Sequence, residues 1–397
     1  MFATFAAAAI EHTPGSPSPA KAAYQVLSPE DFTAAQQEIM AWDGYAATPL
    51  VALTGLADTL GVARIDYKDE GPRFGLGSFK ALGGSYAAMR VLQREIGKAT
   101  GQAVSLEDIR KGHFKEDCAK ITLVSATDGN HGRSLAWGCQ RVGAPCRIYI
   151  HAEVSEGRAT AMRDLGADVV RIEGDYDASV HLAKQEAENN GWFVVSDTSW
   201  PGYTEPPRDV MAGYGVMTRE TCDELTAPPT HVFLQGGVGG LAASVAAALR
   251  QYYGDQSPRV VIVEPDRAAC LFASAKAGEA TTVAIHDETI MAGLSCGEPS
   301  SMAWDILAEE ASDFIVIPDS IVAPTVRLLA RPAFGDPVIH AGESAVAGLA
   351  AVIAARQNET LSKTLGLDAK SRVLLIGSEG VTDPEIFNAI LQGADHV

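Results

Sequence analysis

The sequence is short of cysteines and of basic residues, and both shortages narrow its possible functions. Six cysteines in 397 residues are too few for a disulfide scaffold, so we expect a reducing, cytoplasmic environment. The cysteines form no C-x-x-C pair, and the nine histidines show no H-E-x-x-H motif, so the sequence gives no support for a metal site. The chain has 31 lysines and arginines against 50 aspartates and glutamates, a net charge of −19. This charge argues against partners such as nucleic acid or an anionic membrane.

Long hydrophobic runs and internal repeats are also missing. The apolar segment 1–10 lacks the basic flank of a signal peptide and is too short to span a bilayer. We expect residues 13–21, which are rich in proline and serine, to form a flexible arm. With 47% hydrophobic and 20% charged residues, the chain can bury a large core, which excludes disorder throughout. At roughly 150 residues per domain, its length allows two or three domains.

Short β-rich runs alternate with amphipathic segments from about residue 60 onward. This alternation predicts an α/β fold with parallel sheets and helices on both faces. We expect strands at residues 63–67, 121–125, 147–150, 169–172, 193–195, 232–234, 260–263, 314–317 and 373–376. We expect helices at 79–96, 131–142, 158–165, 179–189, 205–225, 241–252, 343–356 and 383–391, and a surface excursion at 99–119. Ligands of such sheets bind where strands end and helices begin, so four loops of unusual composition are candidate sites.

The first loop, residues 75–84, leads a lysine into a helix between small residues. At a partly buried helix start, desolvation and the positive end of the helix dipole would lower the pKa of Lys80. A free amine is a nucleophile toward a carbonyl, as in Schiff-base chemistry. Most lysines lie solvated on helix surfaces, so Lys80 alone is a weak signal.

In the second loop, a strand leads directly into residues 127–132 (TDGNHG). The Asn130 side chain and the amides of this turn could donate hydrogen bonds to an oxyanion or a carboxylate. Asp128 or Asn130 could instead cap the following helix. Capping explains one of these residues but not the whole run.

The third loop, residues 234–242 (LQGGVGGLA), places four glycines between a strand and a helix. Exposed amides and the helix dipole could bind a phosphate there. Its loose G-x-G-x-x-A spacing, with Glu264 closing the next strand, also allows a dinucleotide. An NAD(P)-binding or flavin oxidoreductase is therefore a rival interpretation.

The fourth loop, residues 375–383, ends a strand in a Gly-Ser turn before a helix. Capping can account for Thr382 or Asp383. Ser378 is left over and could contact a ligand that the other three loops hold.

In this order the four loops resemble those of fold-type II pyridoxal-phosphate enzymes, such as threonine and serine dehydratases, cysteine synthases and tryptophan synthase β chains. The resemblance implies two open, twisted, mostly parallel sheets flanked by helices, and pyridoxal 5'-phosphate as the cofactor. It assigns nine residues to cofactor binding: Phe79, Lys80, Asn130, Gly237, Val238, Gly239, Gly240, Glu343 and Ser378. Lys80 would form the Schiff base, Asn130 would contact the phenolic oxygen, the glycine loop would hold the phosphate, and Ser378 would face the pyridine nitrogen. The dinucleotide interpretation does not explain Lys80, Asn130 and Ser378 together.

Longer stretches resemble the diaminopropionate ammonia-lyases, from about residue 42 to the C-terminus. They are residues 74–86 (FGLGSFKALGGSY), 126–133 (ATDGNHGR), 197–204 (DTSWPGYT), 291–299 (MAGLSCGEP) and 342–344 (GES). The resemblance implies elimination of ammonia from 2,3-diaminopropionate, as the D and/or L isomer, to give pyruvate and two ammonia. A serine, threonine or 3-hydroxyaspartate dehydratase of the same fold is the alternative.

Three residues would carry the catalysis: Lys80, Asp128 and Asp197. The resemblance implies that Asp128 takes the Cα proton of the D isomer, and that Lys80, assisted by Asp197, acts on the L isomer. Asp197 could instead cap a turn. The substrate contacts would be Thr127, Asp128, His131 and Tyr176, although Tyr176 could simply pack on its own helix.

The order of the motifs implies a large domain of residues 1–88 and 213–397 and a small inserted domain of residues 89–212. The cofactor would lie in the cleft between them, and a homodimer is usual for this fold. Cys270 and Cys296 could approach each other, and we expect reduced buried thiols at both positions.

Overall fold

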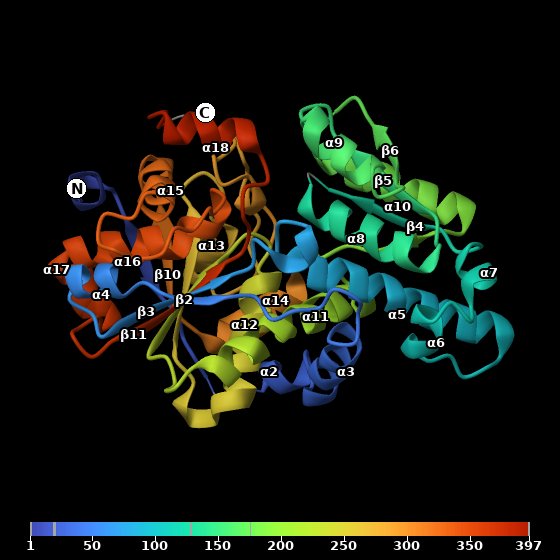
Figure 1. The fold of residues 1–397 in the computed structure, drawn as a ribbon, viewed down its shortest axis with the longest axis horizontal. Helices are drawn as coiled ribbons and strands as arrows, with labels where there is room; N and C mark the ends of the chain where they lie inside the picture. The colour runs from blue at the N-terminus through green and yellow to red at the C-terminus, as the bar shows by residue number, and fades with distance from the viewer. Residues whose placement is uncertain (1, 19–20, 128, 175, 396–397) are drawn as a thin grey trace. The chain divides into compact units, whose positions relative to one another are not determined.

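The computed structural model describes residues 2–18, 21–127, 129–174 and 176–395 (Figure 1). The chain divides into two compact units. The larger unit comprises Met1–Pro29, Ala47–Ser78 and Met217–Val397, and the smaller unit comprises Glu30–Ala46 and Phe79–Val216. Each unit contains one sheet, and helix α11 (Glu205–Glu224) begins in the smaller unit and ends in the larger.

The larger unit contains a seven-stranded sheet whose five central strands are parallel. Their order is β10 (Ala311–Ile317), β9 (Arg259–Pro265), β8 (His231–Gln235), β11 (Arg372–Gly377) and β3 (Arg64–Asp69). The antiparallel strands β1 (Glu11–Pro14) and β2 (Leu50–Ala52) form its two edges. Strands β8, β9 and β11 carry apolar runs that are buried almost along their whole length, as parallel strands covered on both faces require.

Helices cover this sheet and supply most of its core. The α-helices of the larger unit are α1 (Ala3–Ala7), α2 (Ala22–Gln25), α4 (Thr54–Leu60), α12 (Gly240–Tyr253), α13 (Cys270–Ala277), α14 (Ser301–Glu310), α15 (Val322–Ala330), α16 (Ala347–Gln357), α17 (Glu359–Leu365) and α18 (Pro384–Leu391). Its short 3-10 helices are η1 (Arg73–Gly75), η2 (Gly254–Gln256), η3 (Ala292–Leu294), η4 (Asp319–Ile321) and η5 (Ser344–Val346). Helix α16 is apolar on almost every side because it packs in the centre of this core.

The smaller unit contains a four-stranded parallel sheet. Its order is β6 (Asp168–Arg171), β5 (Cys146–Ile150), β4 (Leu123–Ala126) and β7 (Phe193–Val194). Its helices are α5 (Lys80–Thr100), α6 (Leu106–Arg110), α7 (Lys115–Cys118), α8 (Asn130–Val142), α9 (Glu156–Arg163) and α10 (Tyr176–Asn190), with α3 (Pro29–Ile39) joining it from the N-terminal side. Figure 1 shows α8, α9 and α10 beside strands β4, β5 and β6.

The structure confirms the predicted fold class and all nine predicted strands, with shifted ends. The expectation of a flexible arm at residues 13–21 is wrong at its start. Thr13 and Pro14 belong to β1, which pairs with β10. Residues 99–119, expected as a surface excursion, contain the short helices α6 and α7. The predicted helix at 343–356 begins later, as α16, after the 3-10 turn η5.

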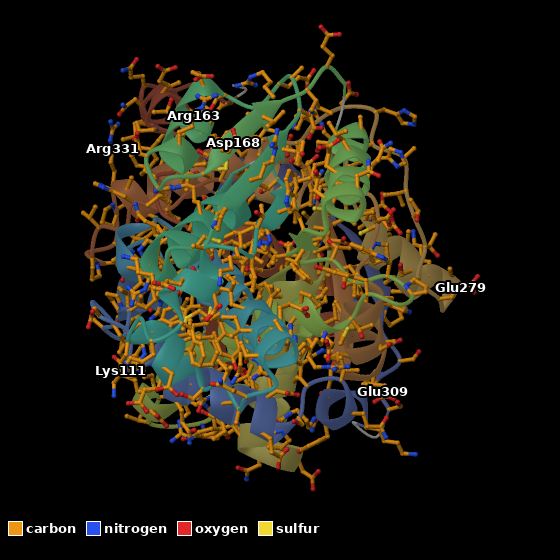
Figure 2. The ribbon with its side chains drawn as sticks, turned by 90° about the vertical axis from the view of Figure 1, so that its right-hand side faces the viewer. Lys111, Arg163, Asp168, Glu279, Glu309 and Arg331 are labelled. Atoms are coloured by element: carbon orange, nitrogen blue, oxygen red, sulfur yellow. The ribbon has the colours of Figure 1, made fainter. Side chains whose placement is uncertain are left out.

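Charged side chains lie mainly on the outside of the molecule. Figure 2 labels exposed examples, among them Lys111, Asp168 and Glu279. No helix in the described ranges combines the length and the apolar composition that a membrane crossing requires.

Candidate active site

Lys80 is the first residue of α5, and its amine lies in an enclosed polar contact. The Nζ atom donates a hydrogen bond to Oδ2 of Asp197, and the Lys80 side chain is only 22% exposed. The ring centroids of Phe79 and Tyr214 lie 5.4 and 6.0 Å from Nζ. Lys80 is therefore a half-buried amine with one carboxylate partner and aromatic walls, unlike a solvated surface lysine.

Two helices meet closely and thereby place the starts of α5 and α8 in the same region. The Ser85 amide donates to Oγ of Ser134 at 3.0 Å, and the Ser85 hydroxyl donates to the Ser134 carbonyl at 2.6 Å. A Cβ atom on Gly84 would lie 2.7 Å from Oγ of Ser134, and one on Gly138 would lie 2.7 Å from Cα of Ser85. The small residues after Lys80 are thus required by helix packing.

Asp197 follows strand β7 and is an ionised acid. Burial alone would raise the pKa of its carboxyl group, but the positive charge of Lys80 and its hydrogen bond hold that pKa well below its usual range. Asp197 therefore remains a carboxylate and can stabilise positive charge on the Lys80 amine.

His131 lies in the first turn of α8 and is buried. Its Nε2 atom lies 2.9 Å from the carbonyl oxygen of Val195, so Nε2 carries the proton and donates it. Its Nδ1 atom then faces Asp197, 4.0 Å from Oδ2. Burial lowers the pKa of His131 despite the nearby carboxylate, so the imidazole is neutral.

The structure describes some of the other predicted substrate and cofactor contacts but not Asp128. Asn130 begins α8, and the buried Thr127 accepts a hydrogen bond from the Gly129 amide at 3.2 Å. Asp128, the predicted base for the D isomer, lies outside the described residues. Tyr176, at the start of α10, is 40% exposed. The structure thus brings together Lys80, Asp197 and His131.

Two tyrosines that we did not predict support this group. Tyr214 of α11 is buried with its ring centroid 4.6 Å from that of Phe79, which places it beside Lys80. The hydroxyl of Tyr203 accepts a hydrogen bond from the Ser196 amide at 3.0 Å and donates one to the Val194 carbonyl at 2.9 Å. Tyr203 lies within the 197–204 motif, whereas no local sequence pattern marks Tyr214.

In the larger unit, the glycine loop forms a backbone cradle between β8 and α12. Gly237 and Gly239 have positive φ angles of 62° and 95°, which side-chain-bearing residues rarely adopt. In the described part of the chain, the amides of Gly237 and Val238 have no protein acceptor. They lie before the first turn of a 14-residue helix, so the loop is suited to bind an anion.

Ser378 and Glu343 belong to two segments near this loop. Ser378 directly follows strand β11, the neighbour of β8, and Glu343 directly precedes η5. Both are buried, and the Gly342 amide donates to the Glu379 carbonyl at 3.1 Å, which joins their two segments. Gln235, which we did not predict, connects them to the loop. Its Nε2 donates to the carbonyls of Ala345, at 3.1 Å, and Ile376, at 2.6 Å.

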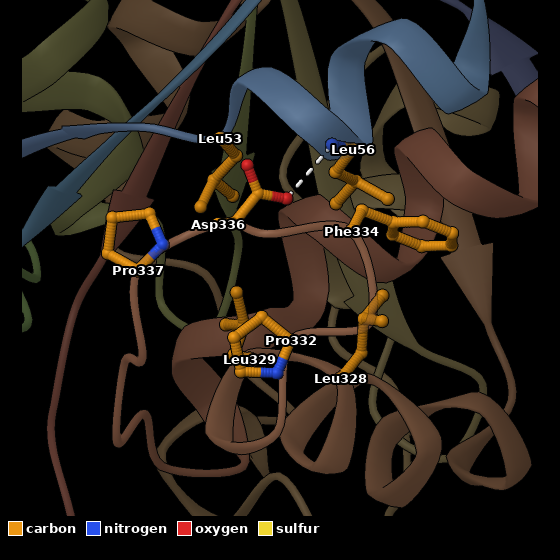
Figure 3. Close-up of a pocket in the computed structure, with 8 residues that line it drawn as sticks. All are labelled: Leu53, Leu56, Leu328, Leu329, Pro332, Phe334, Asp336 and Pro337. Atoms are coloured by element: carbon orange, nitrogen blue, oxygen red, sulfur yellow. Dashed lines mark hydrogen bonds between the residues drawn. The ribbon is translucent and has the colours of Figure 1, made fainter.

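Two other features of the larger unit involve none of the predicted site side chains. Cys270 is a buried thiol whose Sγ donates to the Gly237 carbonyl at 3.5 Å. Figure 3 shows an apolar pocket lined by Leu53, Leu56 and Phe334, with Asp336 at its edge, and none of the predicted site residues lines it.

Comparison with known proteins gives consistent results. The model of the family "Pyridoxal-phosphate dependent enzyme" matches residues 41–379. The chain is 39% identical over 360 residues to the diaminopropionate ammonia-lyase of Escherichia coli K12, covering 89% of each chain. It superimposes on crystal structures of the Escherichia coli enzyme in complex with an aminoacrylate-PLP azomethine reaction intermediate and with D-serine. Each has a TM-score of 0.87 and 36% identity over 98% of both chains.

Proposed function

Because the chain belongs to the diaminopropionate ammonia-lyase family of pyridoxal-phosphate-dependent enzymes, we propose that it eliminates ammonia from 2,3-diaminopropionate, as the D and/or L isomer, to yield pyruvate and a second ammonia. The enzyme has the type II fold and is a carbon–nitrogen lyase with pyridoxal 5'-phosphate as its cofactor. The observation that carries the proposal is the enclosed contact of the Lys80 amine with the Asp197 carboxylate. Family membership decides against the nicotinamide interpretation of the glycine loop.

The residues fit the cofactor in two respects. Lys80 offers a single half-buried amine for the aldehyde. The glycine loop offers unpartnered amides at a helix start for the phosphate. Among the described residues, Asn130 would bind the phenolic oxygen, Ser378 the pyridine nitrogen, and Phe79 and Glu343 would complete the cofactor contacts.

We assign the chemistry of this chain to three described side chains. When bound, pyridoxal phosphate supplies an electron sink that delocalises the carbanion formed at the substrate Cα. Lys80 would hold the cofactor at its aldehyde and would move a proton at the substrate Cα. Asp197 holds the Lys80 amine in place and stabilises its protonated form. The neutral His131 packs against Asp197 without adding a charge.

The resemblance also supports a different base for each isomer. Lys80 with Asp197 would act on the L isomer, and Asp128 on the D isomer. Thr127, Asp128, His131 and Tyr176 would contact the substrate. A carboxylate at position 128 also suits a substrate with a second ammonium group on Cβ.

The alternative is a dehydratase of the same fold that acts on serine, threonine or 3-hydroxyaspartate. The structure of the Escherichia coli relative with D-serine supports keeping it. The two activities differ only in the leaving group, so a direct comparison of substrates separates them.

Pyruvate release from D- and L-diaminopropionate, measured beside D- and L-serine, tests the proposal. We expect kcat/KM to be highest for a diaminopropionate isomer, and faster turnover of serine would refute it. Lys80→Ala should abolish turnover. Borohydride reduction of the native enzyme should fix the cofactor on the peptide that contains Lys80, and labelling of another lysine would refute its role.

We also propose that the enzyme is a cytoplasmic homodimer. The low cysteine content supports a reducing compartment, and the assembly rests on the usual state of this fold. Light scattering after size-exclusion chromatography would show twice the chain mass of 41.7 kDa, and a monomer would refute it.

A further inference from the structure

A fully buried glutamate lies directly behind the glycine loop and has no role in the mechanism above. Glu264, in strand β9, accepts hydrogen bonds from the amides of Leu271 at 3.0 Å and Phe272 at 2.7 Å. These amides belong to the first turn of α13, so one carboxyl group satisfies two of its free donors.

The same side chain is packed against the loop. A Cβ atom on Gly236 would lie only 2.4 Å from Cγ of Glu264, so the loop backbone rests on this side chain without a gap. Cys270 is a second link between Glu264 and the glycine loop. Its Sγ lies 3.5 Å from the Gly237 carbonyl and 3.8 Å from Oε1 of Glu264. Glu264 thus contacts the backbone that presents the unpartnered amides of Gly237 and Val238.

We propose that Glu264 is a positioning residue for the cofactor phosphate: its carboxyl group fixes the start of α13 and the Gly236–Gly237 backbone, and so keeps the loop amides aimed at the phosphate. This inference rests on the proposed function of the loop. It adds a residue that would touch neither cofactor nor substrate.

The surroundings of Glu264 also set its charge. No lysine, arginine or histidine in the described ranges pairs with it, and burial raises its pKa to about 8 against the effect of the Leu271 and Phe272 amides. The titratable group that faces it is the thiol of Cys270 on α13, whose own pKa burial raises far above neutrality. At pH 7 the carboxyl is therefore neutral and does not repel a phosphate dianion, whereas ionisation above pH 8 places a negative charge behind the loop.

Binding of pyridoxine 5'-phosphate to the full chain stripped of cofactor tests the proposal, because this probe has the phosphate but no aldehyde for Lys80. Glu264→Gln keeps the shape but turns an amide nitrogen toward a backbone N–H, and should weaken binding about tenfold at pH 7. Pyridoxine, which lacks the phosphate, should bind equally to both proteins. The wild-type dissociation constant should rise between pH 7.5 and 9, and that of Glu264→Gln should stay flat.

Asp336→Asn is the matched control. The Asp336 carboxylate accepts hydrogen bonds from the amides of Gly55, at 2.8 Å, and Leu56, at 2.9 Å. These amides lie at the start of α4 in the same unit (Figure 3). It should lose stability without any change in phosphate binding. If Glu264→Gln behaves like this control, Glu264 is only structural and the inference is refuted.

A loop variant separates this inference from the proposed function. Gly237→Ala strains a backbone with a positive φ and should weaken binding of pyridoxine 5'-phosphate. Normal binding by Gly237→Ala would refute the phosphate loop itself. Weak binding by Gly237→Ala with normal binding by Glu264→Gln would refute only the role of Glu264. If Glu264→Gln does not fold, a flat wild-type pH profile would still refute the inference.

Discussion

Neutralising Glu220 removes the shared partner of two buried cations in the larger unit. One carboxylate oxygen lies 2.7 Å from Nζ of Lys68, and both oxygens lie 2.8 Å from the guanidinium of Arg73. The side chains of Lys68 and Arg73 are 0% and 1% exposed, so water cannot replace the lost charge. Glu220→Gln keeps the shape but removes this charge, and the Thr48 carbonyl that accepts from Lys68 at 2.7 Å is neutral.

The expected loss is about 3 kcal/mol. Burial raises the pKa of Glu220, but Arg73 and Lys68 outweigh burial and lower that pKa from 4.5 to about 2. At about 1.4 kcal/mol for each pKa unit, this drop corresponds to about 3 kcal/mol. Breaking a buried ion pair by removing one partner typically costs about 3–5 kcal/mol, which agrees. Because the folded-state pKa is lowered, the stabilisation is complete above about pH 4.5 and is lost as the pH falls toward 2.

Urea unfolding of the cofactor-loaded enzyme, followed by circular dichroism, measures this loss. At pH 7, Glu220→Gln should lower the free energy of unfolding with an unchanged urea dependence, and the difference from wild type should shrink toward pH 3. The control is Glu359→Gln, because Glu359 pairs with Lys363 at 2.6 Å with both side chains over 70% exposed. We expect this control to change the free energy by less than about 0.5 kcal/mol. Equal effects of the two variants, or a constant difference down to pH 3, would refute the reasoning.

Three further outcomes are expected. Gly377→Ala would place a Cβ atom 2.1 Å from the ring of the buried Tyr67, so it should lower the free energy of unfolding by about 1–3 kcal/mol. An unchanged unfolding temperature in calorimetry would contradict this. Asp197→Asn should lower kcat for L-diaminopropionate about 10²–10⁴-fold and affect the D isomer less, while Asp128→Asn should do the reverse; equal losses for both isomers would count against two bases. Because burial lowers the pKa of His131, its ring should not titrate in NMR spectra above pH 6.5, and a transition near pH 7 would show that it carries a charge.

The central strands could be predicted from the sequence because they are buried on both faces. Residues 260–263 (VVIV) are apolar without alternation and lie inside the larger sheet. The edge strand β1 (Glu11–Pro14, EHTP) has no such pattern and is held by backbone pairing with β10. A segment whose structure depends on a partner about 300 residues away has no local signal to detect.

The features of the candidate site also fall into those that a local motif marks and those that depend on contacts between distant segments. Lys80, Asn130 and the glycine loop lie in local motifs, so the sequence identified them. The contact of Lys80 with Asp197 joins residues 117 positions apart, and no local pattern indicates it; only the family resemblance paired the two residues. Gln235 was missed because its role exists only once β8 and β11 are neighbours.

Three buried or half-buried carboxyl groups show that partners, more than burial, decide the charge inside this protein. Burial raises the pKa of all three: Asp197, Glu220 and Glu264. Lys80 reverses that effect for Asp197, and two cations reverse it for Glu220. Among the described residues no cation pairs with Glu264, and its pKa is raised to about 8. Asp197 is thus ionised at neutral pH while the Lys80 amine beside it carries its positive charge. Glu264, without such a cation, would ionise above about pH 8, and a loss of activity there is where it would contribute through the cofactor phosphate.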